Sequence, residues 1–408
     1  MKILLANKFF YLKGGAEVSF FETANLLKDR GHKVIYFSMK HPRNYISEYE
    51  KYFVSNVDYE KNGFKNKIGV SLKLLYSFEA KRKIEKLIKK EQPDIVHLHN
   101  IHHQITPSIL YSFKKSNIPV IMTLHDYKMV CPSYSMLSDG KICEACKCGG
   151  YYRCFLKSCV KNSHAKSLLN TIEMYLHHKI LHIYNLIDIF ISPSQFLKNK
   201  VKEMGMKGNV VYLPYFIDVE AYCPSYDWEE NTIVYFGRLS REKGLFTLLE
   251  AMKGFSNITL KIIGEGPIRE SLELEVRSLK LKNVRFLGYM SGVPLKEEIR
   301  KSMFVIVPSE WYENYPFVII EGFALGKPVI GSRIGGIPEL VRDNETGLTF
   351  EPGNAEDLSE KIKAILADSS SLIKMGENAR RFVETELNPE KHYQRLMEIY
   401  SRVIVHNL

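Results

Sequence analysis

The stretch Trp311-Tyr-Glu313-Asn-Tyr-Pro316-Phe-Val-Ile-Ile-Glu321-Gly322 carries two acidic side chains eight positions apart. It follows the apolar run 304–307, which predicts a strand, and its own apolar half predicts the start of a helix. Glu313 would then lie in the loop and Glu321 in the helix, where both can face one cavity at the end of the strand. Carboxylates accept hydrogen bonds from hydroxyl groups without a metal, so the pair suits a polyhydroxylated ligand. The alternative is two acids on an ordinary surface loop and helix.

A second loop, earlier in the chain, carries positive charge. The stretch Gly237-Arg238-Leu-Ser-Arg-Glu-Lys243-Gly244 follows a predicted strand over 231–236 and precedes a predicted helix. A loop in this position offers free backbone amides together with positive charge, which is what a diphosphate requires. Arg238 can bind two phosphate oxygens through its fork, whereas Lys243 acts as a point charge. Gly237 leaves room for close approach of the ligand.

Together these two patterns, Gly-Arg-x5-Gly and Glu-x7-Glu, resemble the family-4, retaining glycosyltransferases with the two-Rossmann GT-B architecture. The stretches 326–330 (Gly-Lys-Pro-Val-Ile), 335–339 (Gly-Gly-Ile-Pro-Glu) and 346–347 (Thr-Gly) belong to the same set. The resemblance covers nearly the whole chain except roughly residues 130–170. This sequence departs from the family pattern at residues 314–316, Asn-Tyr-Pro, where many relatives carry Gly-Phe-Gly, and that departure bears on the identity of the donor sugar.

The resemblance implies a role for each residue of the donor site. Glu321 is expected to contact the ribose hydroxyls of a nucleotide, and Glu313 to hold the hydroxyls of the donor sugar. Arg238 and Lys243 are expected to stabilise the negative charge on the leaving diphosphate. Backbone amides around Pro316, Phe317 and Val318 are expected to reach the sugar or the phosphate. From the residues themselves, Gly264 in Gly-Glu-Gly-Pro predicts a tight turn near the donor, and Tyr289 is a candidate wall for the base.

The first half of the chain supplies further candidates. Gly15, in the loop after the first predicted strand, either approaches a ligand or simply turns the chain into its helix, and the family pattern favours the first. His125 closes a predicted strand over 119–125 and resembles the histidine that reaches the donor sugar in related enzymes. The aromatic side chains just before Gly15 either line an acceptor cleft or belong to the core; they are Phe9, Phe10 and Tyr11. The candidate acceptor contacts at the end of the preceding strand are His97, His99, Asn100, His102 and His103.

Strands alternate with helices along both halves, which predicts an α/β protein with two parallel sheets, each covered on both faces. The predicted domains are 1–214, on the acceptor side, and 215–389, which binds the donor. The junction falls in 214–224, which has a proline at each end. The tail, about 390–408, has a helical pattern, and the resemblance implies that it packs back on the first domain.

The chain has 408 residues, of which 45% are hydrophobic and 25% charged, as in ordinary globular proteins. It contains no apolar run of about 18 residues and no recognisable signal peptide, so the expected location is cytoplasmic. Residues 1–214 hold 33 Lys and Arg against 17 Asp and Glu, a balance of +16; the remainder holds 24 against 29. That basic half is either a solvated surface or one that meets an anionic membrane on its inner face. Nucleic acid is not an expected partner, because no recognition motif accompanies the charge.

Six of the seven cysteines fall between Cys131 and Cys159, in a segment of about 130–170 that is predicted to be a Cys-rich insertion in the first domain. The Cys143-Glu-Ala-Cys146 spacing is typical of metal ligands, and clustered cysteines in a reducing compartment are more easily explained by a metal than by disulfides. The sequence therefore predicts a structural zinc held by Cys143, Cys146, Cys148 and Cys154. Free thiols in a loop are the alternative, because the spacing is irregular.

The expected function is that of a retaining, hexosyl or related glycosyltransferase that needs no metal for catalysis. Its donor would be a nucleotide-diphosphate sugar, UDP rather than GDP, and its acceptor a glycan or lipid-linked molecule in cell-surface polysaccharide or glycoconjugate synthesis. Glu313, His125, Arg238 and Lys243 are the predicted catalytic residues. Two alternatives remain open: a GT-B nucleotide-sugar epimerase, and a basic nucleic-acid-binding protein built around the cysteines.

Overall fold

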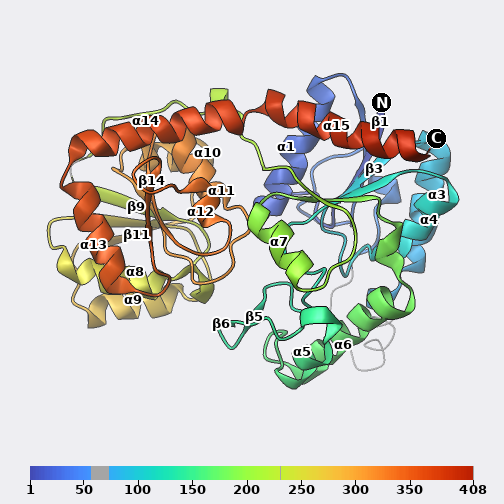
Figure 1. Cartoon of the computed structure of the whole chain (residues 1–408), viewed down its shortest axis with the longest axis horizontal. Coiled ribbons are helices and arrows are strands. Elements are labelled where there is room, and N and C mark those ends of the chain that lie inside the picture. The colour runs from blue at the N-terminus through green and yellow to red at the C-terminus, as the bar shows by residue number, and fades with distance from the viewer. Residues whose placement is uncertain (57–72, 230, 408) are drawn as a thin grey trace. The chain divides into compact units, whose positions relative to one another are not determined.

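The computed structural model describes residues 1–56, 73–229 and 231–407. They form two compact units (Figure 1). Unit 1 comprises Met1–Asp139, Cys143–Pro214 and His392–Leu408, and unit 2 comprises Gly140–Ile142 and Tyr215–Lys391. Each unit is built on one six-stranded sheet.

The sheet of unit 1 has the order β2-β1-β3-β4-β7-β8, and all its pairings are parallel. Its central strands are buried along their whole length, as expected where helices cover both faces. The strands are β1 (Lys2–Ala6), β2 (Lys33–Phe37), β3 (Ile95–Leu98), β4 (Val120–Thr123), β7 (Ile189–Ser192) and β8 (Val210–Tyr212). The short strands β5 (Leu137–Ser138) and β6 (Lys141–Ile142) form a separate two-stranded sheet.

Three of the six α-helices that lie wholly in the described part of unit 1 begin at a capping side chain. Ser77, Ser163 and Ser194 each accept a hydrogen bond from a backbone N–H in the first turn of the helix that follows. The helices are α1 (Gly15–Asp29), α3 (Phe78–Glu91), α4 (Leu110–Lys115), α5 (Tyr152–Leu156), α6 (His164–Tyr175) and α7 (Gln195–Glu203). A π-helical turn over Leu176–Ile180 continues α6, and 3-10 turns occupy Glu50–Tyr52, Pro107–Ile109, Lys147–Gly149 and Ile183–Leu186.

The last helix, α15 (Pro389–Asn407), contributes most of its length to unit 1. The Tyr400 hydroxyl lies 2.8 Å from Nδ1 of His97 on β3, and the Tyr393 hydroxyl lies 2.8 Å from Nε2 of His32. Leu396, Tyr400 and Val403 are buried. Spacings of three and four residues along the tail place these side chains on one face of the helix.

The sheet of unit 2 has the order β11-β10-β9-β12-β13-β14, again parallel throughout. Successive residues of its central strand point to opposite faces: Ile233 and Tyr235 belong to one apolar cluster, and Val234 and Phe236 to the other. The strands are β9 (Thr232–Phe236), β10 (Thr259–Ile263), β11 (Val284–Gly288), β12 (Val305–Val307), β13 (Val329–Ser332) and β14 (Gly347–Phe350).

Helices cover both of these clusters. One cluster includes buried side chains of α8, α9, α13 and α14, and the other includes those of α10, α11, α12 and α14. The helices are α8 (Leu245–Ala251), α9 (Arg269–Ser278), α10 (Gly292–Arg300), α11 (Phe317–Ala324), α12 (Ile337–Leu340), α13 (Ala355–Leu366) and α14 (Ser369–Glu386). Three 3-10 turns lie at Val219–Ala221, Arg241–Lys243 and Met252–Gly254.

The α/β class with two parallel sheets, predicted from the sequence, is confirmed. The strands predicted over 119–125, 231–236 and 304–307 correspond to β4, β9 and β12 within about two residues, whereas β14 was not predicted. That strand reads Gly-Leu-Thr-Phe and so lacks the continuous apolar run that marks a strand such as β12. None of the helices in the described residues combines the length and apolarity that a bilayer span needs.

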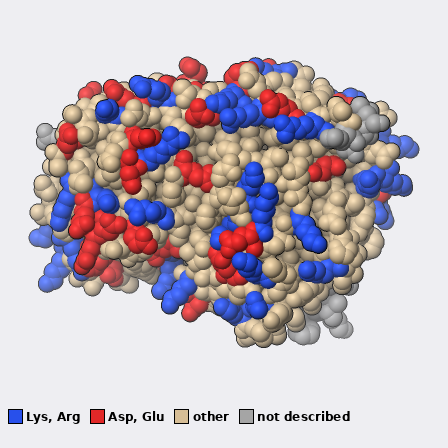
Figure 2. Space-filling model, in the orientation of Figure 1, with Lys and Arg blue, Asp and Glu red and all other residues tan. Residues whose placement is uncertain are grey.

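Charge on the molecular surface is intermixed. On the face shown in Figure 2, Lys and Arg side chains are interspersed with Asp and Glu, and no patch of one sign spans the whole face. On this face the basic residues do not gather into one continuous patch.

Candidate functional site

The strand order of unit 2 reverses between β9 and β12, because the chain leaves β9 toward β10 on one side and later returns to form β12 on the other. In open parallel sheets ligands bind at the carboxyl ends of the strands at such a reversal. The loop after β9 is 237–244 and the loop after β12 is 308–316. The two loops singled out in the sequence therefore lie at the carboxyl ends of adjacent strands, where the strand order reverses.

The backbone of the loop 237–244 packs directly against the backbone of the turn that follows β10. Gly237 N donates to the carbonyl of Ile263, and Leu239 N donates to the carbonyl of Glu265, at 2.9 and 3.0 Å. A Cβ added at Gly264 would lie 1.9 Å from the carbonyl oxygen of Gly237, and the φ of Gly264 is +140°. Gly264 is therefore required for close packing of the loop, in agreement with the predicted tight turn.

Lys243 and Glu313 meet at this reversal. The Nζ of Lys243 lies 2.5 Å from Oε1 of Glu313, and the Ser309 hydroxyl donates to the same oxygen at 2.7 Å. Burial of Glu313 favours its neutral form, but the Lys243 charge and these hydrogen bonds outweigh it and lower the pKa of the carboxyl. Glu313 is therefore ionised at neutral pH, and in the ligand-free protein it neutralises Lys243.

The backbone around Glu313 is also fixed. Gly336 N donates to the Glu313 carbonyl at 2.8 Å, and a Cβ on Gly335 would lie 2.3 Å from that same oxygen. Gly335 has a φ of +61°, so both its conformation and its surroundings require glycine. The Gly-Gly pair noted in the sequence thus holds the Glu313 loop in place.

Arg238 is exposed at the end of β9, and its guanidinium makes no ion pair with any described residue. Its carbonyl accepts a hydrogen bond from the Tyr235 hydroxyl at 2.8 Å, which anchors the backbone while leaving the side chain free. Of the two predicted phosphate ligands, Arg238 carries the available charge and Lys243 a charge that is already paired.

Glu321 lies in the second turn of α11. The Tyr222 hydroxyl lies 3.4 Å from Oε1 of Glu321, and Lys296 Nζ lies 3.8 Å from the centre of the Tyr222 ring. Burial raises the pKa of Glu321 to about 7, although Tyr222 and Lys296 oppose the shift. Glu321 therefore titrates in the physiological range, unlike Glu313.

The remaining predicted donor residues are placed as follows. Pro316 caps α11, and Phe317 and Val318 form its first turn, where backbone N–H groups have no helical partner. Tyr289 follows β11 and is 74% exposed. A hollow of about 610 Å³ lies at the opposite edge of the sheet, near Asn231, Ile258 and Met303, residues that precede strands, so it is not part of this site.

In unit 1 the strand order reverses between β1 and β3, and polar side chains gather where these strands end. Asn7 accepts from Asn100 N at 3.1 Å and donates to the Glu17 carboxylate at 3.2 Å. Lys8 follows Asn7 and lies close enough to Asp126 and Glu17 for their charges to act on it. Burial lowers the pKa of Lys8 and raises that of Asp126.

His125 is part of a row of imidazoles. Its Nε2 lies 2.9 Å from Nδ1 of His99, and His99 stacks on His97 with ring centres 4.6 Å apart. His97 in turn hydrogen-bonds the hydroxyls of Thr123 and Tyr400. Burial lowers the pKa of His125 to about 3, with Lys8 adding to the effect, so the ring is neutral at physiological pH. The histidines named as candidate acceptor contacts serve partly to orient His125.

The other candidates of unit 1 have different environments. Gly15 begins α1 and is exposed, with Gly14 at the N-cap. Phe10 is 3% exposed and packs against Phe20 and Phe53. Of the two alternatives given for it, an acceptor cleft or the core, Phe10 therefore belongs to the core. Phe9 is partly exposed, and Lys13 Nζ lies over its ring, 3.9 Å from the ring centre.

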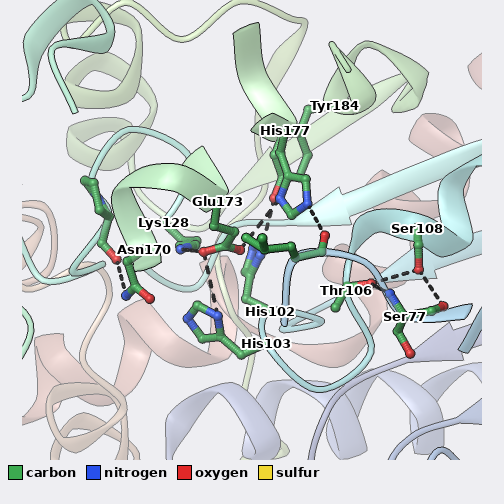
Figure 3. Close-up of polar contacts among 12 residues, drawn as sticks. Ser77, His102, His103, Thr106, Ser108, Lys128, Asn170, Glu173, His177 and Tyr184 are labelled. Carbon is green, nitrogen blue, oxygen red and sulfur yellow. Dashed lines mark hydrogen bonds and ion pairs between the residues drawn. The ribbon is translucent and has the colours of Figure 1, made fainter. Parts of the chain in front are cut away.

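A buried ion pair joins Lys128, three residues after His125, to Glu173 on α6. Lys128 Nζ lies 2.6 Å from Oε2 of Glu173, and both side chains are 2% exposed. Figure 3 shows the Glu173 carboxylate between Lys128, His103 and His177, with each histidine nitrogen 3.7 Å from a carboxylate oxygen. Burial would raise the pKa of Glu173, but these neighbours lower it. Sequence reasoning missed this pair, because nothing local marks either residue as buried.

The predicted zinc ligands do not form a metal site. Cys146 and Cys154 are buried in a small apolar cluster with Tyr151 and Met174. Cys148, by contrast, is exposed and packs against Gly205, and its amide donates to the carbonyl of Met204.

The fourth predicted ligand, Cys143, is partly exposed, with Lys157 Nζ 3.7 Å from its sulfur. Among the described residues no group of three or more His, Cys, Asp or Glu side chains is arranged to hold a metal. The zinc prediction for Cys143, Cys146, Cys148 and Cys154 is therefore not supported by the described residues.

Comparison with known proteins gives two family matches that together span most of the chain. Residues 13–221 match Glycosyltransferase Family 4, and residues 225–382 match Glycosyl transferases group 1. An uncharacterised glycosyltransferase of Methanocaldococcus jannaschii is 27% identical over 404 residues, which is 99% of each chain.

Solved structures give the same result for the fold. Sucrose-phosphate synthase from Thermosynechococcus elongatus superimposes with a TM-score of 0.74 at 19% identity, covering 99% of both chains. Anabaena HepE in complex with UDP superimposes with a TM-score of 0.69 at 16% identity, covering 98% of this chain and all of the other. These likenesses confirm the GT-B fold.

Proposed function

This chain belongs to glycosyltransferase family 4, and from that premise we propose that it moves a sugar from a UDP-sugar to a glycan or lipid-linked acceptor. The observation that carries the donor half of the proposal is the meeting of Lys243 and Glu313 at the strand reversal, beside the free charge of Arg238. UDP is preferred to GDP because HepE, which shares the fold, binds UDP. The acceptor would belong to cell-surface polysaccharide or glycoconjugate synthesis.

In the proposed reaction the bond between the sugar and the diphosphate breaks, and the acceptor hydroxyl oxygen bonds to the sugar on the same face, so the configuration is retained. The hydroxyl proton passes to the oxygen of the departing diphosphate. Arg238 and Lys243 stabilise the charge that develops on the leaving diphosphate. When the diphosphate binds, Lys243 exchanges part of its contact with Glu313 for phosphate oxygens. The Glu313 carboxylate then becomes available to the donor sugar hydroxyls. No metal is needed for these steps, which use only side chains of this chain.

His125 is neutral, so it acts in the proposed mechanism as a hydrogen-bonding group that positions the donor sugar and carries no charge. Its Nε2 is already held by His99, which fixes the ring orientation. Gly15 and the first turn of α1 provide a backbone surface for a ligand on the same side of the sheet.

A nucleotide screen tests the donor. UDP, GDP and ADP are added separately and the melting temperature is measured. A nucleotide present at 100 times its dissociation constant should stabilise the protein by about 2.7 kcal/mol. We expect UDP to give the largest shift. A larger shift with GDP would overturn the choice of base and leave the transferase proposal standing.

The reaction class is tested with isotope-labelled UDP-sugar in the absence of an acceptor. A transferase releases free sugar slowly, whereas a nucleotide-sugar epimerase returns an isomeric nucleotide sugar. A protein that only binds nucleic acid does neither. Formation of the isomer would overturn the proposal in favour of the epimerase.

The two glutamates should separate in kinetics. Glu321→Ala is expected mainly to weaken nucleotide binding, and Glu313→Ala mainly to lower the turnover number, since one contacts the ribose and the other the reacting sugar. Nucleotide affinity by calorimetry and initial rates at saturating donor distinguish the two effects. An unchanged affinity in Glu321→Ala would remove its ribose role.

Nucleotide affinity should also depend on pH through Glu321. Below a pKa of about 7 the carboxyl is protonated and loses acceptor capacity toward the two ribose hydroxyls. We therefore expect UDP to bind more tightly as pH rises from 6 to 8, with the change levelling off above the pKa. Glu321→Gln is the control, because it retains the shape without titrating. An identical pH profile in the control would contradict the assignment.

The basic first half of the chain supports a further part of the proposal, a peripheral location on the inner face of the cell membrane, where lipid-linked acceptors are found. If the contact is electrostatic, it should weaken as added salt shortens the Debye length from about 10 Å at 0.1 M to about 3 Å at 1 M.

A further inference from the structure

Helix α6 buries polar side chains and exposes apolar ones. Its inward side carries Ser167, Asn170, Thr171 and Glu173, all at most 8% exposed, along with Met174. These polar groups are satisfied inside: Asn170 donates to the Pro132 carbonyl at 3.1 Å and Thr171 to the Tyr151 carbonyl at 3.2 Å. Figure 3 shows this inner side, with Asn170 and Glu173 turned toward the rest of unit 1.

The outward side of the same helix is apolar. Leu168 is 43% exposed and Ile172 is 44% exposed, and they are four residues apart, which places them on one face. An amphipathic helix of a globular domain normally buries such residues and exposes its polar ones. Helix α3 of the same unit does so, with Ile84 and Leu87 buried and Lys86 and Lys89 exposed.

Neighbouring elements extend this surface. Helix α5 packs beside α6, since the Tyr175 hydroxyl accepts from Tyr152 N at 3.4 Å and the rings of Phe155 and His164 are in contact. We call the following set the apolar face: Tyr152 and Leu156 on α5, Leu168 and Ile172 on α6, and Ile180 after it. Their side chains are each between 43% and 68% exposed. Single exposed apolar residues are common, but five on adjacent elements require an explanation.

Positively charged residues accompany the apolar face along the chain. Between Lys141 and Lys179 the sequence holds seven Lys and Arg residues and two acids. Both acids are already paired, Glu144 with Lys200 at 2.8 Å and Glu173 with Lys128. The charge presented by this segment is therefore almost entirely basic. Exposed residues that contribute to it are Arg153, Lys157, Lys161, Lys166 and Lys179.

We propose that the apolar face is a membrane-docking surface, which inserts its apolar side chains among the acyl chains of an anionic lipid bilayer while the Lys and Arg residues of the same segment bind the headgroups. Apolar side chains beside Lys and Arg are the combination that places a helix in the membrane interface. A second copy of this chain fits less well, because pairing the face with itself would bring two sets of basic residues together. The inference deepens the proposed peripheral location and is independent of the donor and the reaction.

Vesicle flotation tests the proposal directly. The whole protein is mixed with vesicles of equal parts phosphatidylglycerol and phosphatidylcholine, or of phosphatidylcholine alone, at low salt. Wild type should float with the anionic vesicles. The variant Leu168→Ser/Ile172→Ser should bind these vesicles at least about tenfold more weakly, because it removes the inserting side chains and leaves the charge unchanged.

A matched control is available in unit 2. Leu274 and Val293 are 62% and 71% exposed, so Leu274→Ser/Val293→Ser makes the same chemical change elsewhere. The control should float like wild type. Equal loss in both variants, or flotation of Leu168→Ser/Ile172→Ser at wild-type strength, would overturn the proposal.

A second variant keeps the test decisive if the first fails to fold. Lys161→Glu/Lys166→Glu changes only exposed charges and should also weaken binding to anionic vesicles, by at least about 30-fold. UDP affinity is measured on every variant and should not change, which separates a failure of docking from a failure of the donor site. A wild-type protein that dimerises in sedimentation equilibrium through this face and does not float would replace the membrane with a second copy.

Discussion

Arg238→Ala and Lys243→Ala are each expected to reduce sugar transfer about 100- to 1,000-fold, or about 2.7 to 4 kcal/mol of transition-state stabilisation. The reason is that both charges lie at the strand reversal of unit 2, where a diphosphate leaving group would develop negative charge. Initial rates with saturating donor and acceptor measure the effect. The melting temperature should change little in Arg238→Ala, whose side chain is exposed.

The two variants should differ in one respect. Lys243→Ala also removes the partner of a buried carboxylate, so Glu313 is left without its ion pair and its pKa should rise. Arg241→Ala, in the same loop, removes a charge of the same sign from an exposed position and serves as the control. Near-normal turnover by both Arg238→Ala and Lys243→Ala would remove these residues from the mechanism.

Glu173→Gln is expected to destabilise unit 1 by about 3 to 5 kcal/mol. The substitution preserves the size of the side chain but leaves the Lys128 ammonium buried without an opposite charge, and an uncompensated buried charge is costly. Urea unfolding followed by circular dichroism measures the loss. The pair also connects α6 to the segment that follows His125, so transfer activity should fall at temperatures where the variant remains folded.

Two control variants identify why Glu173→Gln loses stability. Glu203→Gln removes a carboxylate that pairs with Lys147 and Lys200 at the surface, and it should cause no resolvable loss, since exposed ion pairs contribute little. Lys128→Met/Glu173→Leu removes both buried charges and should recover much of the stability lost in Glu173→Gln. If the double variant is as unstable as the single one, the loss comes from packing or from the histidines and not from the unpaired lysine.

The positions of the proposed donor residues in the fold were largely predictable because their signals are local. The glycines at 237, 244, 264 and 335 occupy positions that the backbone requires, and the acids of the second loop follow a strand that periodicity reveals. Their electrostatic states were not predictable. Glu313 and Glu321 are only eight residues apart, yet the pKa of one is lowered by Lys243 while burial raises that of the other to about 7.

The zinc site predicted from the cysteine spacing is also not supported by the tertiary structure. Four thiols at metal-like spacing were expected to converge, but Cys148 is exposed beside Gly205 while Cys146 and Cys154 are buried in apolar surroundings. Convergence of ligands depends on the direction of each side chain, which the helices and turns of this segment set independently.

The sequence by itself determined the alternation of strands and helices, the glycine turns and the family, because each of these depends on neighbours within a few residues along the chain. Tertiary structure alone decided which charges meet. Lys243 and Glu313 are 70 residues apart, Lys128 and Glu173 are 45 apart, and His97 and Tyr400 are 303 apart. It also decided which side of α6 is buried, because burial is set by the elements that pack against a helix as well as by its own pattern.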